Sequence, residues 1–480
     1  LVGPIPGKRN AYCIIGLRAG LGEGGGHGWL LAQQIVHGEA CYDTWCIDPR
    51  RFTAHANVEM TSLKAIEDYQ NEFRFHFPHE HRPAGRPAKT TSLTAVLAAE
   101  NAEFTVINGW ERVEYIKPSA DFHPSLSFHF DETFDIVAGE IKNVQDNVGL
   151  CEVNGFNRFE ITGSDAYDFL DRMFCGSVTR KPGRVGLGYL LNDFGMVKTE
   201  ATIANIPASD RGENRIWYGS AAASEFHDMD WLSQHINYNE KVQIQSLTND
   251  QTILLLAGPK SRDVLSACSR EDWSKEAFPW LSVRECFIGF SAAMVMSVSF
   301  SGELAYEVHV PNASLYAAYL ALSEAGKTYG MKLFGSRAIE SMRMEKGFLS
   351  WKTDLLTEFD PFETGLDRFV NLKKDNFIGK TALEKRFKNG PNQKLVCLSV
   401  DCTHAPAHGG ASLMEDDKVV GTITSGEWGH RVNVNLALAF VNPDKSEPGT
   451  KMMLDLLGEM VPAEVIPQGP YDSSYSRILA

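Results

Sequence analysis

The sequence predicts an α+β protein of several domains whose last part is entirely β. The chain has 480 residues, of which 43% are hydrophobic and 22% are charged, as in ordinary globular proteins. At about 150 residues per domain, this length corresponds to about three domains. Strand-like and helix-like segments alternate through the middle of the chain, whereas residues 394–477 contain only short strands and glycine turns.

Charge, cysteines and hydropathy exclude several classes of protein. The net charge is −15 and no run of Lys or Arg occurs, so nucleic acid is not an expected partner. The nine cysteines form no C-x-x-C pair, which predicts reduced thiols and no metal site. The chain shows no secretory signal, and its longest uncharged apolar run, residues 286–301, is too short for a bilayer. We therefore expect a soluble protein of a bacterial cytoplasm or a mitochondrial matrix.

The first predicted elements are a strand at residues 12–17 and a helix that runs through Val36. Gly25 and Gly26 lie in the glycine-rich stretch between them. A glycine turn that opens a helix can approach a phosphate or a cofactor edge closely, so both glycines are candidate cofactor contacts. No G-x-G-x-x-G follows the strand, so a complete dinucleotide-binding domain is not predicted.

The middle of the chain predicts a series of strands and helices. Ser164 is a candidate helix cap, and residues 184–191 and 196–203 are predicted to form a hairpin around an Asp- and Gly-containing turn. Further strands are expected at 148–153 and 252–259, and further helices at 315–325 and 336–346.

Two segments carry the strongest functional signal, residues 300–308 (FSGELAYEV) and 341–347 (SMRMEKG). The first contains Glu303 and Glu307, which an offset of four would place on one face of a strand. A pterin ring presents an amino group and a ring N–H side by side, and one carboxylate can accept both. The alternative is a glycine turn that opens an exposed strand.

These segments resemble the Y-[ST]-G-E-x-G-[YF]-E and L-R-x-E-x-G motifs of folate-binding aminomethyltransferases, the glycine-cleavage T-protein family. Four more segments match it in order: 351–354, 361–366, 376–380 and 421–426. The resemblance spans about residues 112–477. It implies a T-protein-like folate-binding module at 113–390 and a small β-barrel domain at 391–480.

The N-terminal part resembles a different set of proteins. Residues 47–52 (IDPRRF), 77–80 (FPHE), 84–87 (AGRP) and 108–112 (NGWER) are similar to segments of dimethylglycine- and sarcosine-dehydrogenase-like flavoenzymes. This resemblance implies that residues 1–50 are the C-terminal remnant of an FAD-binding domain. It also implies that residues 51–112 form the linker domain between flavin and folate modules.

The resemblance also implies site residues. The T-protein family has an Asp in G-G-x-x-x-D, and Glu200 takes its place here, with Thr199 one register step away. A carboxylate there would stabilise an iminium cation and relay the proton that the folate nitrogen loses. Glu307 matches the carboxylate that recognises the pterin, and Glu303 is expected to be structural. Phe300 replaces a Tyr, so it could stack on the pterin but not donate a hydrogen bond.

Arg337 and Arg343 resemble the arginines of the helix that meets the folate tail, whose carboxylate suits an Arg fork. Helix neighbours pair readily, so the alternative for Arg343 is a pair with Glu340 or Glu345.

Tyr189 and Trp351 are candidate walls of the folate channel. The alternative for each is a packing role in the core, because large aromatic side chains are mostly buried.

The implied function is tetrahydrofolate-dependent demethylation of an N-methylated amine of the dimethylglycine or sarcosine type. The oxidised methyl group would be captured as 5,10-methylenetetrahydrofolate, and FAD would act in a flavin domain, on a longer polypeptide or a separate chain. One alternative is a flavin-independent, folate-dependent demethylase. Another is a non-enzymatic folate-binding protein, whose relatives carry a Cys in a K-G-C-Y-like motif where this chain has Phe348.

Overall fold

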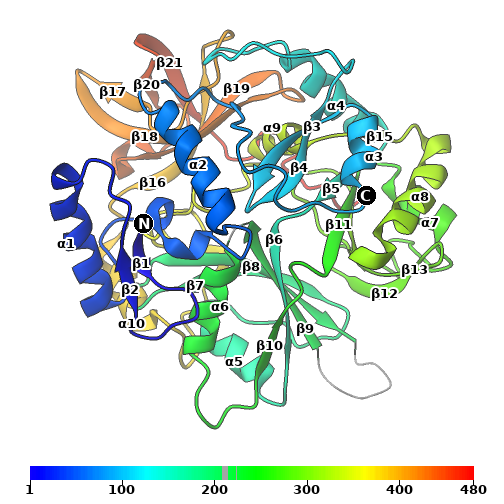
Figure 1. Ribbon diagram of the computed structural model, residues 1–480, viewed down its shortest axis with the longest axis horizontal. Helices are drawn as coiled ribbons and strands as arrows, with labels where there is room; N and C mark the ends of the chain where they lie inside the picture. Colours follow the sequence, from blue (N-terminus) through cyan, green and yellow to red (C-terminus); the bar gives the residue numbers. More distant parts are fainter. Residues whose placement is uncertain (208–214, 223) are drawn as a thin grey trace.

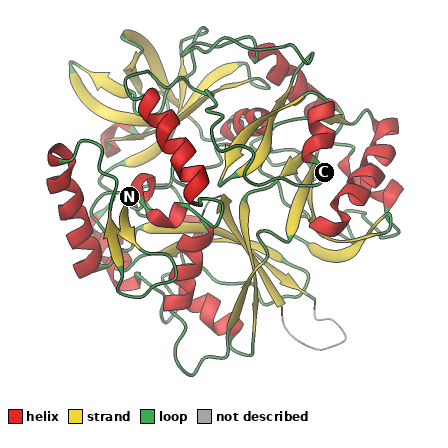
Figure 2. Ribbon diagram, in the orientation of Figure 1, coloured by secondary structure: helices red, strands yellow, loops and turns green. Residues whose placement is uncertain are grey.

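A computed structural model describes residues 1–207, 215–222 and 224–480 (Figure 1). Two β-sheets form the centre of the molecule, and a β-barrel lies at one side of them (Figures 1 and 2). The N-terminal residues lie on the outside of the sheets and the barrel (Figure 1). The predicted α+β class is confirmed. Within the described residues, no helix has both the length and the apolar character needed to cross a bilayer.

The first central sheet is antiparallel throughout and contains the predicted hairpin. Its strand order is β10 (Gln243–Ser246), β6 (Phe156–Thr162), β9 (Arg215–Ala222), β8 (Val197–Ile206) and β7 (Val185–Leu191). Helices α5 (Ala166–Met173) and α6 (Glu225–Gln234) cover one face of it. Their apolar side chains pack on Phe159 and Tyr218, which leaves the other face free for a second layer.

The second central sheet mixes one parallel pair with antiparallel ones. Its order is β12 (Val283–Ile288), β13 (Ser291–Met296), β14 (Ala305–Pro311), β11 (Gln251–Ala257), β5 (Gly149–Val153) and β15 (Lys332–Leu333). Helices α7 (Ser261–Cys268) and α8 (Leu315–Gly326) pack on one face. Helices α4 (Phe134–Asp146) and α9 (Ser336–Lys346) pack on part of the other.

The C-terminal strands close into a barrel, as predicted. Its order is β16 (Lys394–Val400), β19 (Val434–Val441), β18 (Lys418–Gly429), β17 (Ser412–Glu415), β20 (Lys451–Leu456) and β21 (Glu459–Ile466). Inward-facing residues such as Leu398, Leu413 and Leu454 are buried and give the barrel its own core. Helix α10 (Lys380–Asn389) leads into it.

The N-terminal residues form small elements on the outside of this body. They are β1 (Val2–Pro4), β2 (Tyr12–Ile14), α1 (Leu21–His37), α2 (Val58–Gln70), α3 (Thr94–Ala99), β3 (Ala102–Ile107) and β4 (Trp110–Ile116). Short 3-10 helices lie at Trp45–Ile47, Pro49–Arg51, Asn312–Ser314, Lys327–Tyr329, Asp367–Phe369 and Pro443–Lys445. Only Gln34 is buried in α1, and no residue of α2 is buried.

Two local expectations are wrong. Helix α1 begins at Leu21 and runs through the glycines, so Gly25 and Gly26 lie inside an exposed helix and not in a turn before it. A Cβ on either would meet nothing within 4 Å, so the structure gives neither glycine a close neighbour. Ser164 does not cap α5, because its hydroxyl bonds to the side chain of Asp165.

Replacing Gly25 and Gly26 by Ala is expected to stabilise the protein by about 0.5–1 kcal/mol each. Alanine restricts the unfolded chain and meets no obstacle in this helix. Thermal unfolding measures the effect. Gly258→Ala is the control and should destabilise, since its φ is +129° and its Cβ would lie 2.5 Å from the Val144 carbonyl oxygen. Unchanged or lower stability in the α1 variants would contradict a helical role for these glycines.

Candidate functional site

A β-bulge in the hairpin of β7 and β8 decides which side chain enters the site. Tyr189 pairs with Glu200 and Leu190 with Thr199, but Leu191 pairs with Val197, so Lys198 is the extra residue. Side chains alternate along a strand, so Glu200 lies on the face of Tyr189, and Thr199 lies on the opposite face.

Thr199 is engaged in the core beneath the sheet. Its hydroxyl donates to the carboxylate of Asp228 at 3.0 Å, and Tyr218 and Ser220 donate to the same carboxylate. All four side chains are buried. Thr199 is therefore not available to a ligand between the sheets, whereas Glu200 points toward that space.

Glu200 is half-buried and accepts a hydrogen bond of 2.5 Å from the hydroxyl of Tyr189. Burial raises the pKa of Glu200 to about 7, although the Tyr189 hydrogen bond favours the ionised form. Burial and the neighbouring carboxylate raise the pKa of Tyr189 well above its usual value. The tyrosine therefore stays a donor, while Glu200 can gain or lose a proton near neutral pH.

Glu307 lies on β14 of the second sheet, and its side chain is 30% exposed. Its Oε2 atom is 3.1 Å from Nε2 of His309. The His309 ring lies 4.9 Å from the ring of Trp217, which is on β9 of the first sheet. These contacts join the two sheets.

Strand register places Glu200 and Glu307 on the sides of the two sheets that face each other. Glu200 and Ala204 are four residues apart on β8 and therefore share one face of the sheet. Ala204 pairs with Trp217 on β9. Trp217 contacts His309, which shares a face of β14 with Glu307. Leu187, on the Glu200 face of β7, is 42% exposed although it lies in a central sheet. The facing sides of the sheets therefore offer two carboxylates and an accessible apolar side chain.

Phe300 is 40% exposed and stacks on Phe348, with ring centroids 5.9 Å apart and planes at 17°. It stands in the turn before β14, and Gly302 in that turn has a φ of +82°. A Cβ on Gly302 would lie 2.4 Å from the side chain of Lys346, so this turn requires glycine. An accessible aromatic face is thereby held at the start of the strand that carries Glu307.

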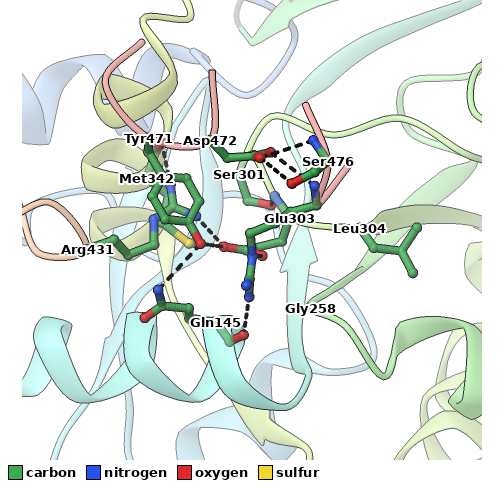
Figure 3. A network of polar contacts seen from close by, with 12 residues as sticks. Gln145, Gly258, Ser301, Glu303, Leu304, Met342, Arg431, Tyr471, Asp472 and Ser476 are labelled. Carbon is green, nitrogen blue, oxygen red and sulfur yellow. Dashed lines mark hydrogen bonds and ion pairs between the residues drawn. The ribbon is translucent and has the colours of Figure 1, made fainter. Parts of the chain in front are cut away.

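Glu303 does not share a face with Glu307, because β14 begins only at Ala305. Glu303 is 1% exposed and lies at the centre of a polar network (Figure 3). It accepts hydrogen bonds of 2.7 Å from Arg431 and from the Tyr471 hydroxyl, and one from Arg477. These partners belong to the barrel and to the C-terminal segment, so Glu303 ties both to the second sheet.

Arg343 is fully buried, and every N–H of its guanidinium has an acceptor. The acceptors are Glu340, Asp354, the Phe348 carbonyl and Ser425. No donor is left for a folate tail, so this expectation is wrong for Arg343. The pairing with Glu340 holds, whereas Glu345 binds Arg431 instead.

Arg337 lines a cavity of about 160 Å³, together with His79, His81, Glu114 and Asp131. Neither Glu200 nor Glu307 lines this cavity. Its guanidinium lies 3.8 Å from Asp131. A larger cavity of about 430 Å³, lined by residues such as Phe278 and Arg284, contains none of the predicted site residues.

Trp351 is half-buried and braces the bulge of β8. Its Nε1 donates to the Lys198 carbonyl at 3.0 Å, and its ring lies 4.9 Å from that of Trp45. The Lys198 ammonium in turn pairs with Glu39. This junction of residues 39–45 with the bulge could not be predicted, because nothing local in the sequence marks it.

Family models match almost the whole chain. The GCVT N-terminal domain matches residues 93–374, and the glycine cleavage T-protein C-terminal barrel domain matches residues 393–472. The FAD dependent oxidoreductase central domain matches residues 37–91.

Individual proteins resemble the chain over its whole length. Human mitochondrial dimethylglycine dehydrogenase is 32% identical over 97% of this chain and 54% of its own. Mouse mitochondrial sarcosine dehydrogenase is 28% identical over 100% of this chain and 57% of its own. The chain thus spans about half the length of these relatives. The crystal structure of aminomethyltransferase T of the glycine cleavage system from Bartonella henselae has the same fold, with a TM-score of 0.69, 20% identity, and coverage of 80% of this chain and 98% of that one.

Proposed function

Because this chain belongs to the family defined by the GCVT N-terminal domain, we propose that it binds tetrahydrofolate and loads it with the carbon of an oxidised N-methyl group. The similarity to dimethylglycine and sarcosine dehydrogenases favours an amine of that type as the donor. The product is 5,10-methylenetetrahydrofolate. The observation that carries this proposal is the pairing of Glu200 with Tyr189 on the sheet that faces Glu307.

Glu307 is proposed to bind the pterin. Its carboxylate is accessible, and an ionised carboxylate can accept the amino group and the ring N–H together. Phe300 offers an exposed aromatic face at the start of the same strand, which suits stacking on the ring. Leu187 supplies apolar contact from the opposite sheet.

Glu200 is proposed to move protons in the transfer. The folate nitrogens lose protons as they bond to the iminium carbon, and the departing amine takes these protons up. A carboxyl with a pKa of about 7 suits this relay, because a general acid–base group works best near the pH at which it operates. In its ionised form, the same carboxylate stabilises the cationic carbon.

FAD is proposed to be held by a further domain and not by the described residues alone. Gly25 and Gly26 lie inside a helix, so they form no phosphate-binding turn. Large apolar side chains on and after α1 and α2 are exposed, among them Trp29, Val36, Tyr69 and Phe73. Such surfaces mark contact areas for other domains. A flavin domain docked there would release the oxidised amine next to the folate module.

Replacing Glu307 by Gln is expected to weaken tetrahydrofolate binding about tenfold or more, because a charge-assisted pairing is lost. Titration calorimetry under anaerobic conditions measures the Kd. The matched control is Glu324→Gln on the exposed surface of α8, which should bind as wild type does.

Three outcomes would change the proposal. A wild-type chain that binds no folate would refute it. Folate binding without transfer, in the presence of a flavin partner and an N-methyl amine, would favour a non-enzymatic folate-binding protein. Transfer from a methylated donor without any flavin would favour a flavin-independent demethylase.

A further inference from the structure

Two buried residues stand behind the accessible carboxylate of Glu307. His309 is fully buried two positions further along β14, and its Nε2 atom contacts Glu307 Oε2. Arg158 is also 0% exposed, on β6 of the facing sheet. Both lie between the sheets and are not accessible to a ligand.

The orientation of His309 follows from its packing. Trp217 meets its ring edge-on, with the ring planes at 76°. The indole of Trp217 covers Gly219, where a Cβ would lie 2.1 Å from the ring, so only glycine leaves room for it. Burial lowers the pKa of His309, which keeps its imidazole neutral with a single N–H. Since Nδ1 has no partner in the part of the chain that the structure describes, the proton belongs on Nε2, from which it is donated to Glu307.

Arg158 is a buried cation with few partners. Among the described residues, the only hydrogen bond of its guanidinium is an Nη2–H bond to the Thr248 carbonyl at 3.2 Å, and Nε and Nη1 have no partner. Burial lowers the pKa of Arg158 to about 10, and the charge of Glu307 acts in the opposite direction. Glu225 and Arg112 also act on it, with opposite signs. A buried guanidinium costs free energy unless a negative charge compensates it.

We propose that His309 and Arg158 are positioning residues that hold the Glu307 carboxylate aimed at the pterin edge. His309 fixes one carboxylate oxygen through its Nε2–H. Arg158 supplies positive charge from the opposite sheet at longer range. Neither residue touches the ligand. Both act through Glu307 on its preference for a pterin with a 2-amino group over one without it. This inference rests on the proposed function, since it assumes that Glu307 binds the pterin.

The test compares two ligands in a set of variants. The ligands are 5-formyltetrahydrofolate, which does not turn over, and its 2-desamino-2-methyl analogue, which lacks the amino donor. The wild-type chain is expected to prefer the first about tenfold. His309→Phe and Arg158→Met are expected to lose most of this preference. His309→Gln keeps an N–H donor and Arg158→Lys keeps the charge, so both should retain it.

A role in packing alone would give a different result. Both ligands would then weaken by the same factor in every variant, and their ratio would stay at the wild-type value, which would overturn the inference. Thermal unfolding shows which variants are folded, and the Gln and Lys variants keep the test decisive if the larger changes unfold the chain. If Glu307→Gln itself leaves the ratio unchanged, the pterin assignment fails first. If Glu307→Gln abolishes the ratio and the His309 and Arg158 variants do not, only the positioning role fails.

Discussion

Replacing Glu200 by Gln is expected to slow one-carbon transfer about 100-fold or more, because the amide cannot accept the proton. Tetrahydrofolate should still bind, since Glu307 on the facing sheet is unchanged. The rate of the wild-type chain should depend on an ionisation with an apparent pKa near 7, which the variant lacks. Single-turnover rates with a flavin partner, measured between pH 5.5 and 8.5, test this.

The same substitution is expected to stabilise the fold at neutral pH. The pKa of Glu200 rises from 4.5 to about 7 on folding, so its favourable contribution is fully present below pH 4.5 and is lost as the pH rises through 7. Glutamine carries no charge to bury. The variant should therefore match the wild type near pH 4.5 and exceed it at pH 8 by roughly 2–3 kcal/mol in free energy of unfolding.

Glu200→Asp is the matched control, because the T-protein family has Asp at this place. It should keep part of the activity and the pH dependence. A Gln variant with wild-type transfer rates would show that another group moves the proton. An unchanged stability difference between pH 4.5 and pH 8 would show that the carboxyl is not desolvated.

Replacing Glu303 by Ala is expected to destabilise the protein by about 3 kcal/mol or more. Arg431 is 0% exposed and would lose one of its two carboxylates, and Tyr471 and Arg477 would lose their shared acceptor (Figure 3). Breaking a buried pair leaves an uncompensated charge, which costs about 3–5 kcal/mol. Chemical denaturation measures the loss.

Glu324→Gln on the exposed surface of α8 is the control for this experiment and should change stability by less than about 0.5 kcal/mol, because its carboxylate is solvated. Glu303→Gln keeps one acceptor oxygen and should lie between the two. Glu303 and Glu307 are four residues apart in one motif, so a large loss of stability in Glu303→Ala and a loss of folate binding in Glu307→Gln would separate their roles. A stable Glu303→Ala variant would show that the network in Figure 3 does not hold the barrel in place.

The local pattern was sufficient for much of the fold. Alternating apolar residues around residues 192–195 predicted the β7–β8 hairpin, and glycine turns predicted the C-terminal strands that close into the barrel. Helical spacing located α8 and α9 to within a residue. These elements follow from short-range rules of side-chain period and turn chemistry. The glycines of α1 were mispredicted because a weak helix former was taken for a turn.

The candidate site depended more on contacts between distant residues. The alternatives Glu200 and Thr199 could not be separated along the chain, because the bulge at Lys198 exists only in the pairing with β7. Arg343 could be weighed against helix neighbours, but its partners Asp354 and Ser425 come from a loop and from the barrel. His309 and Arg158 carry no motif and emerge only from their burial between the sheets.

Residue types and their spacing along the chain were enough to identify the class of fold, the order of its modules and the motif that contains Glu303 and Glu307. The surroundings of each side chain became clear only in the folded molecule. The tertiary structure assigned Glu303 to a buried network and left Glu307 accessible, and it brought Glu200 to the face opposite Glu307. Burial, charge pairing and pKa are set by neighbours from other segments, and a linear pattern does not contain those neighbours.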